Sequence, residues 1–284
     1  WAEPEGTGLK LLSTTVDDDG VVGPIEAIDA RIEESPYQSI QGRRTASADY
    51  LRIGRYLLRV SGVRLDAAID LASWGASSTL TPSNGGVVAT WVTPDGLLMM
   101  QRVSAAGAIE GPAGGTGIAS RVKGVGADGD GDDVLIVYST ENETNLVRVE
   151  GGTGVLSSAG EFPVPHMQPS VVWNGANFIV AWNRGDGLGL VGADVPRTGP
   201  ALFTQRSLLL PAGAPVIFAV GSDSLLVADR RGFCYRYYYC QLDVWVSRLS
   251  LDASLPAESS ALVSGVGAPQ YFQRTAAIGN DFFA

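Results

Sequence analysis

The stretch PSVVWNGANFIVAWN, residues 169–183, contains two apolar runs separated by a short polar segment, and the second run ends at Trp182. Asn174 and Gly175 form the dipeptide most typical of a tight hairpin turn, where the backbone takes positive φ. Short apolar runs that are rich in β-branched and aromatic residues and bounded by turn residues favour strands over helices. This stretch therefore predicts a hairpin of two buried strands.

The apolar phrase at the end of this stretch recurs along the chain. The other copies are GGVVATWV (85–92), DDVLIVYS (132–139) and DSLLVADR (223–230). The four phrases end at Trp91, Tyr138, Trp182 and Asp229. The steps between these ends are 47, 44 and 47 residues. A fixed period of this length indicates a structural repeat rather than one continuous core.

A second marker, a strand followed by a glycine-containing turn, runs in phase with the first. The glycines of these turns are Gly20, Gly107, Gly154 and Gly199. Each repeat then divides into four short strands, which in the copy at residues 166–212 are PSVVWN, FIVAWN, LGLVGADV and ALFTQRSLLL. Four strands for each period of about 45 residues, with no helical pattern between them, predict the blades of an all-β propeller.

The two chain ends extend the repeat. Read through as NDFFAWAEP, residues 280–284 and 1–4 align with NFIVAWNRG. A blade completed by both ends would pair strand edges that are otherwise open. We therefore expect one domain, 1–284, forming a six-bladed propeller of four-stranded antiparallel blades, with one blade shared by the N- and C-terminal segments. The expected blades are 271–284 with 1–25, 26–72, 73–118, 119–165, 166–212 and 213–270.

The pattern PSVVWNGANFIVAWNRGDG…GADVPRTG resembles the tandem propeller repeats of secreted and surface-anchored bacterial proteins, in which an Asn-Gly turn joins two apolar strands and the second ends in Trp. The resemblance implies a bacterial scaffold that is secreted, periplasmic or on the cell surface. It carries no catalytic motif, because such repeats are defined by blade packing.

Charge and hydropathy exclude two classes of partner. The net charge is −10 and the basic residues are scattered, whereas a nucleic-acid binder needs a basic face that releases counterions from phosphate. No apolar run reaches 18 residues, so we expect no membrane span. The partners left are proteins or carbohydrates on a surface, and neighbouring domains or copies in an assembly.

The segment RRGFCYRYYYCQLDVW, 230–245, interrupts the expected blade at 213–270 between its second and third strands. The spacing of Cys234 and Cys240 favours a disulfide across a hairpin, and hence an oxidising compartment; two reduced thiols are the alternative. Rigid loops rich in aromatic residues and Arg are typical contact sites. The predicted ligand-binding residues are Tyr235, Arg236, Tyr237, Tyr238 and Tyr239, with Phe233 beside them. The alternative is that these aromatic residues fold back onto the blade.

The run ADGDGDD, 127–133, is the strongest metal candidate. Asp128, Asp130 and Asp132 alternate, as carboxylates do in calcium loops, and the repeat places the run in the turn between the first two strands of its blade. Ca²⁺ ligands and a solvated turn are the two interpretations. His166, the only histidine, has no nucleophile motif beside it and is given a structural or surface role.

The expected function is therefore an extracellular or cell-surface binding or adhesion scaffold that recognises a protein or glycan through loops on one propeller face. Two alternatives stay open. One is a polysaccharide-acting enzyme, a glycosidase or lyase with acidic residues at the channel mouth, although no carboxylate pair is distinguished in the sequence. The other is a structural unit of a surface assembly.

Overall fold

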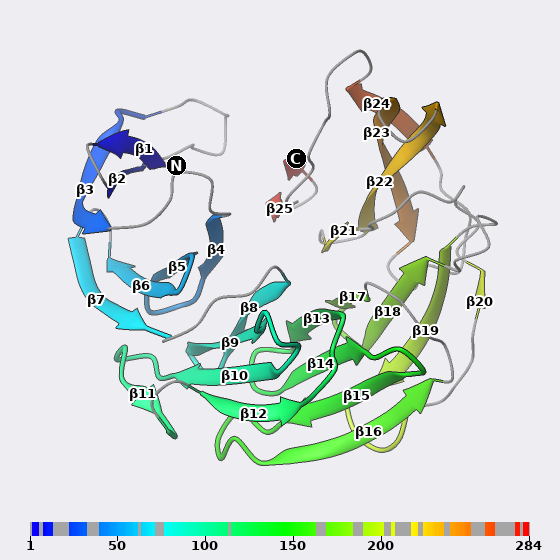
Figure 1. Ribbon diagram of the computed structural model, residues 1–284, viewed down its shortest axis with the longest axis horizontal. Helices are drawn as coiled ribbons and strands as arrows, with labels where there is room; N and C mark the ends of the chain where they lie inside the picture. The colour runs from blue at the N-terminus through cyan, green and yellow to red at the C-terminus, as the bar shows by residue number, and fades with distance from the viewer. Residues whose placement is uncertain are drawn as a thin grey trace. The chain divides into compact units, whose positions relative to one another are not determined.

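The computed structural model describes residues 2–5, 8–13, 23–32, 40–61, 64–71, 77–112, 115–162, 169–183, 190–201, 206–207, 217–220, 224–235, 239–250, 259–264, 276–278 and 281–283 (Figure 1). Within these ranges every regular element is a β-strand and every strand pairing is antiparallel, which confirms the all-β prediction. The described part of the chain contains no helix with the length and hydropathy of a membrane span. The chain forms two compact units, Trp1–Ala119 and Ser120–Ala284.

The first unit contains three sheets. One is formed by β1 (Ala2–Glu5), β2 (Gly8–Ser13) and β3 (Glu26–Ile32). The next has the order β4 (Ile40–Arg44), β5 (Asp49–Ile53), β6 (Tyr56–Ser61) and β7 (Arg64–Asp70). The third is formed by β8 (Ser78–Ser83), β9 (Gly86–Val92), β10 (Leu98–Val103), β11 (Ile109–Glu110) and β12 (Thr116–Ala119), and here both β11 and β12 pair with β10.

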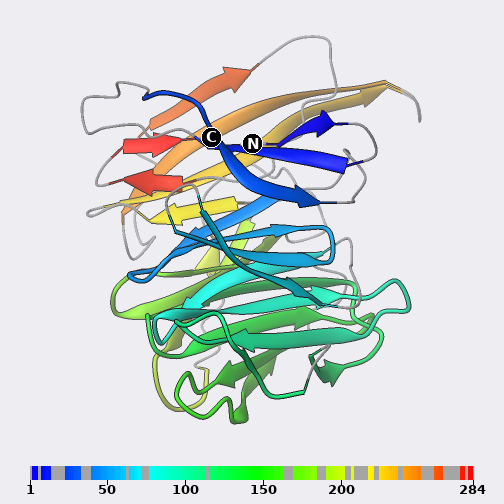
Figure 2. The same ribbon diagram turned by 90° about the vertical axis from the view of Figure 1, so that its left-hand side faces the viewer.

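The second unit repeats the four-stranded order three times (Figures 1 and 2). Its first sheet is β13 (Gly124–Gly129), β14 (Val134–Ser139), β15 (Thr144–Val149) and β16 (Leu156–Phe162). Its second is β17 (Ser170–Trp173), β18 (Asn177–Asn183), β19 (Leu190–Pro196) and β20 (Arg206–Ser207). Its third is β21 (Ile217–Val220), β22 (Ser224–Tyr235), β23 (Tyr239–Ser250) and β24 (Ser259–Ser264). A two-stranded sheet of β25 (Ala276–Ile278) and β26 (Asp281–Phe283) follows.

Strand pairing differs from the expected blade boundaries at the N-terminal end. Strand β3 falls in the expected segment 26–72, yet it pairs with β2 and completes the first sheet. The boundary predicted from equal spacing is wrong here because the connection between β2 and β3 is long. Strand β3 therefore lies further along the sequence than the corresponding strand of the other repeats. Strands β1 and β26 belong to separate sheets, and the shared blade and the count of six stay predictions.

Turn residues behave as their chemistry predicts. Asn84 and Gly85 join β8 to β9 with φ of 46° and 75°, the backbone that a two-residue hairpin turn requires. The glycines predicted for the turns after the third strands also have positive φ, namely 83° at Gly107, 74° at Gly154 and 82° at Gly199. Gly20 lies outside the described residues. The glycines that mark the repeat are thus required by the backbone of these turns, because a residue without Cβ adopts positive φ most readily.

Burial explains why the apolar phrase is continuous rather than alternating. All seven residues of β9 are buried, so both faces of this second strand are covered. The outer strand β16 is exposed over Leu156–Ser158. Neighbouring sheets pack face to face: Trp182 and Phe178 of β18 cluster with Leu135 and Val137 of β14. In the first unit, Trp91 takes part in the matching cluster.

The first strands of neighbouring sheets approach closely in the second unit. A Cβ added at Gly126 in β13 would lie 2.4 Å from the carbonyl oxygen of Pro169, directly before β17. Real Cβ atoms do not occupy such a distance from backbone, so a side chain at this position would force the two strands apart. Glycine at 126 therefore lets the inner edges of two sheets meet.

Candidate functional site

The most distinctive element outside the repeat is the hairpin of β22 and β23. Each strand has 12 residues, compared with six in β14 and six in β15. Described pairing with β21 ends at Ala228, and pairing with β24 begins at Val244. Over residues 229–235 and 239–243, the described part of the chain pairs only β22 with β23. We call these two segments the ribbon; β22 and β23 are the long golden and orange strands in Figure 2.

The register of the ribbon sorts its residues onto two faces. Directly paired residues share a face, and successive residues alternate between faces. The aromatic face therefore contains Asp229, Arg231, Phe233, Tyr235, Tyr239, Gln241 and Asp243. The opposite face, which we call the cysteine face, contains Arg230, Gly232, Cys234, Cys240 and Leu242.

Two of the predicted contact residues, Tyr235 and Tyr239, are paired with each other. Arg236, Tyr237 and Tyr238 lie outside the described residues. Gln241, which pairs with Phe233, was missed by the sequence interpretation. Period-two alternation counted back from the hairpin tip would have found it.

Cys234 pairs directly with Cys240. Opposed residues in antiparallel strands have Cα atoms about 4.5–5.5 Å apart, and disulfides bridge Cα separations of about 4.4–6.8 Å. The backbone register is therefore compatible with the predicted disulfide. The bond itself stays a prediction.

The second half of the acidic run, residues 130–133, forms the turn between β13 and β14, as the repeat predicts, whereas Asp128 lies within β13 and pairs with Leu135. Oδ1 of Asp130 accepts hydrogen bonds from the amides of Asp132, at 2.9 Å, and Asp133, at 2.8 Å. Asn174 caps the corresponding turn of the next sheet through the same pair of contacts, to the amides of Ala176 and Asn177. Asp130 is thus the turn-capping residue of its repeat, a role that Asp and Asn share because both side chains carry a suitably placed oxygen.

The predicted calcium ligands also face protein donors. Nε of Arg197 lies 2.6 Å from Oδ2 of Asp130, and its Nη2 lies 3.2 Å from Oδ2 of Asp132. Oδ2 of Asp128 accepts from the amide of Trp173 at 2.8 Å. In the described ranges, no group of three or more His, Cys, Asp or Glu residues is arranged to hold a metal. Calcium binding stays a prediction, and the observed cation between two of the three aspartates is a guanidinium.

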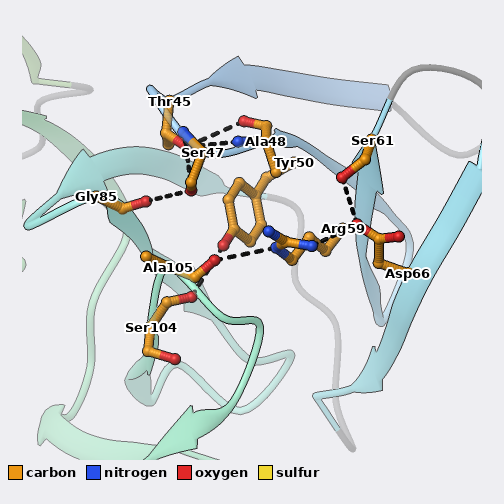
Figure 3. Close-up of polar contacts among 10 residues, drawn as sticks. All are labelled: Thr45, Ser47, Ala48, Tyr50, Arg59, Ser61, Asp66, Gly85, Ser104 and Ala105. Carbon is orange, nitrogen blue, oxygen red and sulfur yellow. Dashed lines mark hydrogen bonds and ion pairs between the residues drawn. The ribbon is translucent and has the colours of Figure 1, made fainter.

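An arginine near the end of the third strand joins neighbouring sheets within each unit. Arg148 of β15 donates from Nη2 to the carbonyl of Pro196 at 2.6 Å and from Nη1 to that of Gly199. Burial lowers the pKa of the Arg148 guanidinium, while the charge of Asp133 opposes that shift. Arg59 of β6 donates from Nε to the carbonyl of Ala105 at 3.1 Å (Figure 3).

Other polar contacts reinforce the same junction in the first unit (Figure 3). The hydroxyl of Tyr50 donates to the carbonyl of Ser104 at 2.9 Å, and that of Ser47 donates to the carbonyl of Gly85 at 2.8 Å. The arginine signal was present in the sequence but missed, because its meaning depends on a neighbouring sheet. The third strands β6, β10 and β15 contain the dipeptide Arg-Val, beginning at Arg59, Arg102 and Arg148, and β23 contains Arg-Leu, beginning at Arg248.

His166, the only histidine in the sequence, lies outside the described residues. The observed contacts of the acidic run and of the arginines stabilise turns and sheet junctions. The ribbon is left as the element that the repeated sheet does not require, and it is the candidate contact element.

Comparisons with known proteins define the fold class and no more. No protein-family model matches the sequence, and no curated protein matches it. Among solved structures, an arginine-to-alanine triple mutant of AofleA from Arthrobotrys oligospora is similar, with a TM-score of 0.53, 12% identity, and coverage of 84% of this chain and 74% of that one. The Pan2 WD40 domain from Neurospora crassa is similar with a TM-score of 0.51, 11% identity, and coverage of 79% of this chain and 65% of that one.

WD40 domains are β-propellers, built from four-stranded blades. The four-stranded antiparallel sheets of this chain, their face-to-face packing within each unit and the likeness to such a domain define a β-propeller protein. Identities of 11–12% carry the fold and not the activity.

Proposed function

We propose that this protein is a non-catalytic binding module of the propeller class, acting outside the cytoplasm as a surface adhesion or recognition scaffold, with the ribbon as its contact element. The single observation that carries the proposal is the extension of β22 and β23 beyond the strands that flank them in their sheet. A repeat needs only strands of about six residues to pack, so the extension serves something other than packing.

The chemistry of the extension supports recognition. Aromatic residues and arginine contribute most of the binding energy in protein contact sites, because they bring large area at low cost in side-chain entropy. The described ribbon contains Phe233, Tyr235 and Tyr239 together with Arg230 and Arg231. Their concentration in one hairpin favours a contact site over a connection.

The direct pairing of Cys234 with Cys240 supports a compartment where disulfides persist, meaning a secreted, periplasmic or surface location. A bridge near the tip would hold the hairpin in one conformation. Less conformational entropy would then be lost when the ribbon binds.

A ribbon-deletion variant tests the proposal. Residues 232–242 are replaced by Asn-Gly, which closes a short hairpin on the pair Arg231 and Asp243. The labelled wild type and variant are applied to immobilised oligosaccharides, purified bacterial polysaccharides and extracted surface proteins. Tyr56→Ala is the control, since Tyr56 is a partly exposed tyrosine of the first unit that contacts Arg55.

We expect the deletion variant to keep the circular dichroism spectrum of the wild type and to lose its binding, while Tyr56→Ala retains both. Undiminished binding by a folded deletion variant would refute the proposal. Release of new reducing ends from any polysaccharide by the wild type would instead support the enzyme alternative. Concentration-dependent growth of particle size in light scattering, with no binding to the panel, would support the assembly alternative.

A further inference from the structure

We infer that a polar row at one end of the first sheet of the second unit binds a cationic side chain, the guanidinium or ammonium group of a basic peptide. The row consists of Tyr138 of β14, Asn145 of β15 and Glu161 of β16, with Glu143 beside it. It lies in a different sheet from the ribbon, so the inference goes beyond the proposed function and does not depend on it.

The strand register brings the three residues of the row onto one face of the sheet. Tyr138 pairs directly with Asn145, and Asn145 pairs directly with Glu161, in neighbouring strands (Figure 1). Directly opposed residues point to the same face, with Cβ atoms about 4.5–5.5 Å apart. Glu143 precedes Asn145 by two residues, and its Oε1 accepts a hydrogen bond from Nδ2 of Asn145 at 3.1 Å. The row therefore brings together an aromatic ring, an amide and a pair of carboxylates.

The repeat does not account for this row, because the matching positions of the neighbouring sheets are apolar. At the ends of their apolar phrases, Trp91 and Trp182 occupy the place of Tyr138, and they are 0% and 2% exposed. Their partners in the third strands are Met99 and Val191. The fourth strands place glycine and serine next in line. Among these three sheets, only the one formed by β13–β16 carries charge in this row.

The row stays accessible although the same face is covered further along the strands. Ile136, two residues before Tyr138 in β14, is completely buried. Tyr138, Asn145 and Glu143 are partly exposed, and Glu161 is exposed. The sheet therefore leaves a polar end open to solvent at a position where the repeat otherwise buries a tryptophan.

The chemistry of the row favours a cation. Burial and, to a smaller extent, the charge of Glu143 raise the pKa of Tyr138, so its ring is a neutral phenol near neutral pH. The face of such a ring attracts guanidinium and ammonium groups. Glu143 and Glu161 add negative charge, whereas the charge of Lys123 is compensated by Glu141 at 3.3 Å. A guanidinium can stack on the ring and donate to a carboxylate at the same time. The net charge of −10 also attracts basic partners at long range.

Peptide titrations followed by NMR test the inference. The isotope-labelled full chain is titrated with capped peptides in which glycines flank a single arginine, lysine or citrulline. Citrulline has the shape of arginine without its charge, so it isolates the effect of charge. Peptide concentrations reach about 10 mM, because one ring and a pair of exposed carboxylates bind a single cation with a Kd on the order of 1 mM.

Matched substitutions show whether the row is the binding site. Tyr138→Leu removes the ring, Tyr138→Phe keeps it, and Glu161→Gln removes a carboxylate of the row. Glu141→Gln is the control, since it removes the same charge from the adjoining turn, where Glu141 is paired with Lys123. Circular dichroism and thermal melting verify that each variant is folded, and if Tyr138→Leu does not fold, the comparison of Glu161→Gln with Glu141→Gln decides.

We expect the arginine and lysine peptides to shift the amide resonances of Glu143 and Asn145, and the citrulline peptide to leave them unchanged. Tyr138→Leu and Glu161→Gln should each weaken the affinity about fivefold, whereas Tyr138→Phe and Glu141→Gln should change it by less than about twofold. Raising the salt concentration should weaken binding, because exposed charges are screened.

Three outcomes would overturn the inference. They are equal shifts with the citrulline peptide, no shift at Glu143 and Asn145 with either charged peptide, and the same loss of affinity in Glu141→Gln as in Glu161→Gln. The ribbon-deletion variant should bind the charged peptides as the wild type does. Its loss of binding to polysaccharides or extracted proteins tests the proposed function alone, so the two ideas can fail separately.

Discussion

Replacing Arg148 by methionine should destabilise the second unit, because this side chain connects two neighbouring sheets. Its guanidinium donates to the carbonyls of Pro196 and Gly199. Methionine keeps much of the apolar stem and removes every donor. The change therefore tests the two hydrogen bonds rather than the packing of the stem.

The magnitude follows from the environment of each bond. A hydrogen bond to a charged group contributes about 1.5–3 kcal/mol. The bond to Pro196 is partly buried and is counted in full, while the bond to Gly199 is exposed and is discounted to roughly 0.5 kcal/mol because water competes for the acceptor. The expected loss is about 2–3.5 kcal/mol, which corresponds to a decrease in Tm of about 3–6 °C for a chain of this size.

The assay is urea unfolding followed by circular dichroism, with two matched variants. Arg55→Met removes an exposed ion pair to Asp70 and should cost no more than about 0.5 kcal/mol. Arg148→Lys keeps the charge but loses the planar fork that reaches two carbonyls, and should give an intermediate loss. Equal stability of Arg148→Met and Arg55→Met would refute the idea that Arg148 holds the sheets together.

Three further outcomes are expected. Gly126→Ala should cost about 1–3 kcal/mol, whereas Gly152→Ala, with no atom within 4 Å of the added Cβ, should stay within about 0.5 kcal/mol; equal unfolding midpoints would contradict the close approach of β13 and β17. Burial, with a smaller contribution from Glu143, raises the pKa of Tyr138 above 10.0. The neutral phenol is therefore favoured in the folded state, and its stabilising effect is lost as pH rises through that folded pKa. Tyrosinate absorbance, referenced to Tyr138→Phe, should show a lower pKa in Glu143→Gln, and an unchanged value would exclude the charge effect. Mass spectrometry without reductant should find the cysteine pair of the ribbon oxidised, and reduction should lower Tm by only a few degrees because the bridge closes a short loop; two free thiols would contradict this.

Much of the strand pattern was accessible from the sequence because its signals are local. The hairpin of β17 and β18 follows from two apolar runs around Asn174 and Gly175. The glycines at 107, 154 and 199 were predicted from turn chemistry, and all have positive φ. Asp130 and Asp132 were placed correctly in the turn between β13 and β14, because the repeat aligns them with the turn at Asn174, whereas Asp128 lies in the strand β13.

The candidate site was only partly accessible. The hairpin that interrupts the expected blade at 213–270, its cysteines and its tyrosines were evident from composition. Which of these residues share a face depends on register, and register joined Gln241 to Phe233 and separated Cys234 from Tyr235. The blade boundary predicted at residue 26 from equal spacing was also wrong for β3. This strand pairs with β2 although a long connection separates the two in the sequence.

The sequence by itself determined the strands, the turns and their repetition, since short apolar runs and the positive φ of turn residues are set by a few neighbouring residues. Only the tertiary structure decided that a guanidinium, that of Arg197, lies between Asp130 and Asp132, and that Arg148 reaches the carbonyls of the next sheet. Such contacts join residues far apart in the chain. They exist because face-to-face packing of the sheets brings the two groups together, and no local pattern encodes that distance.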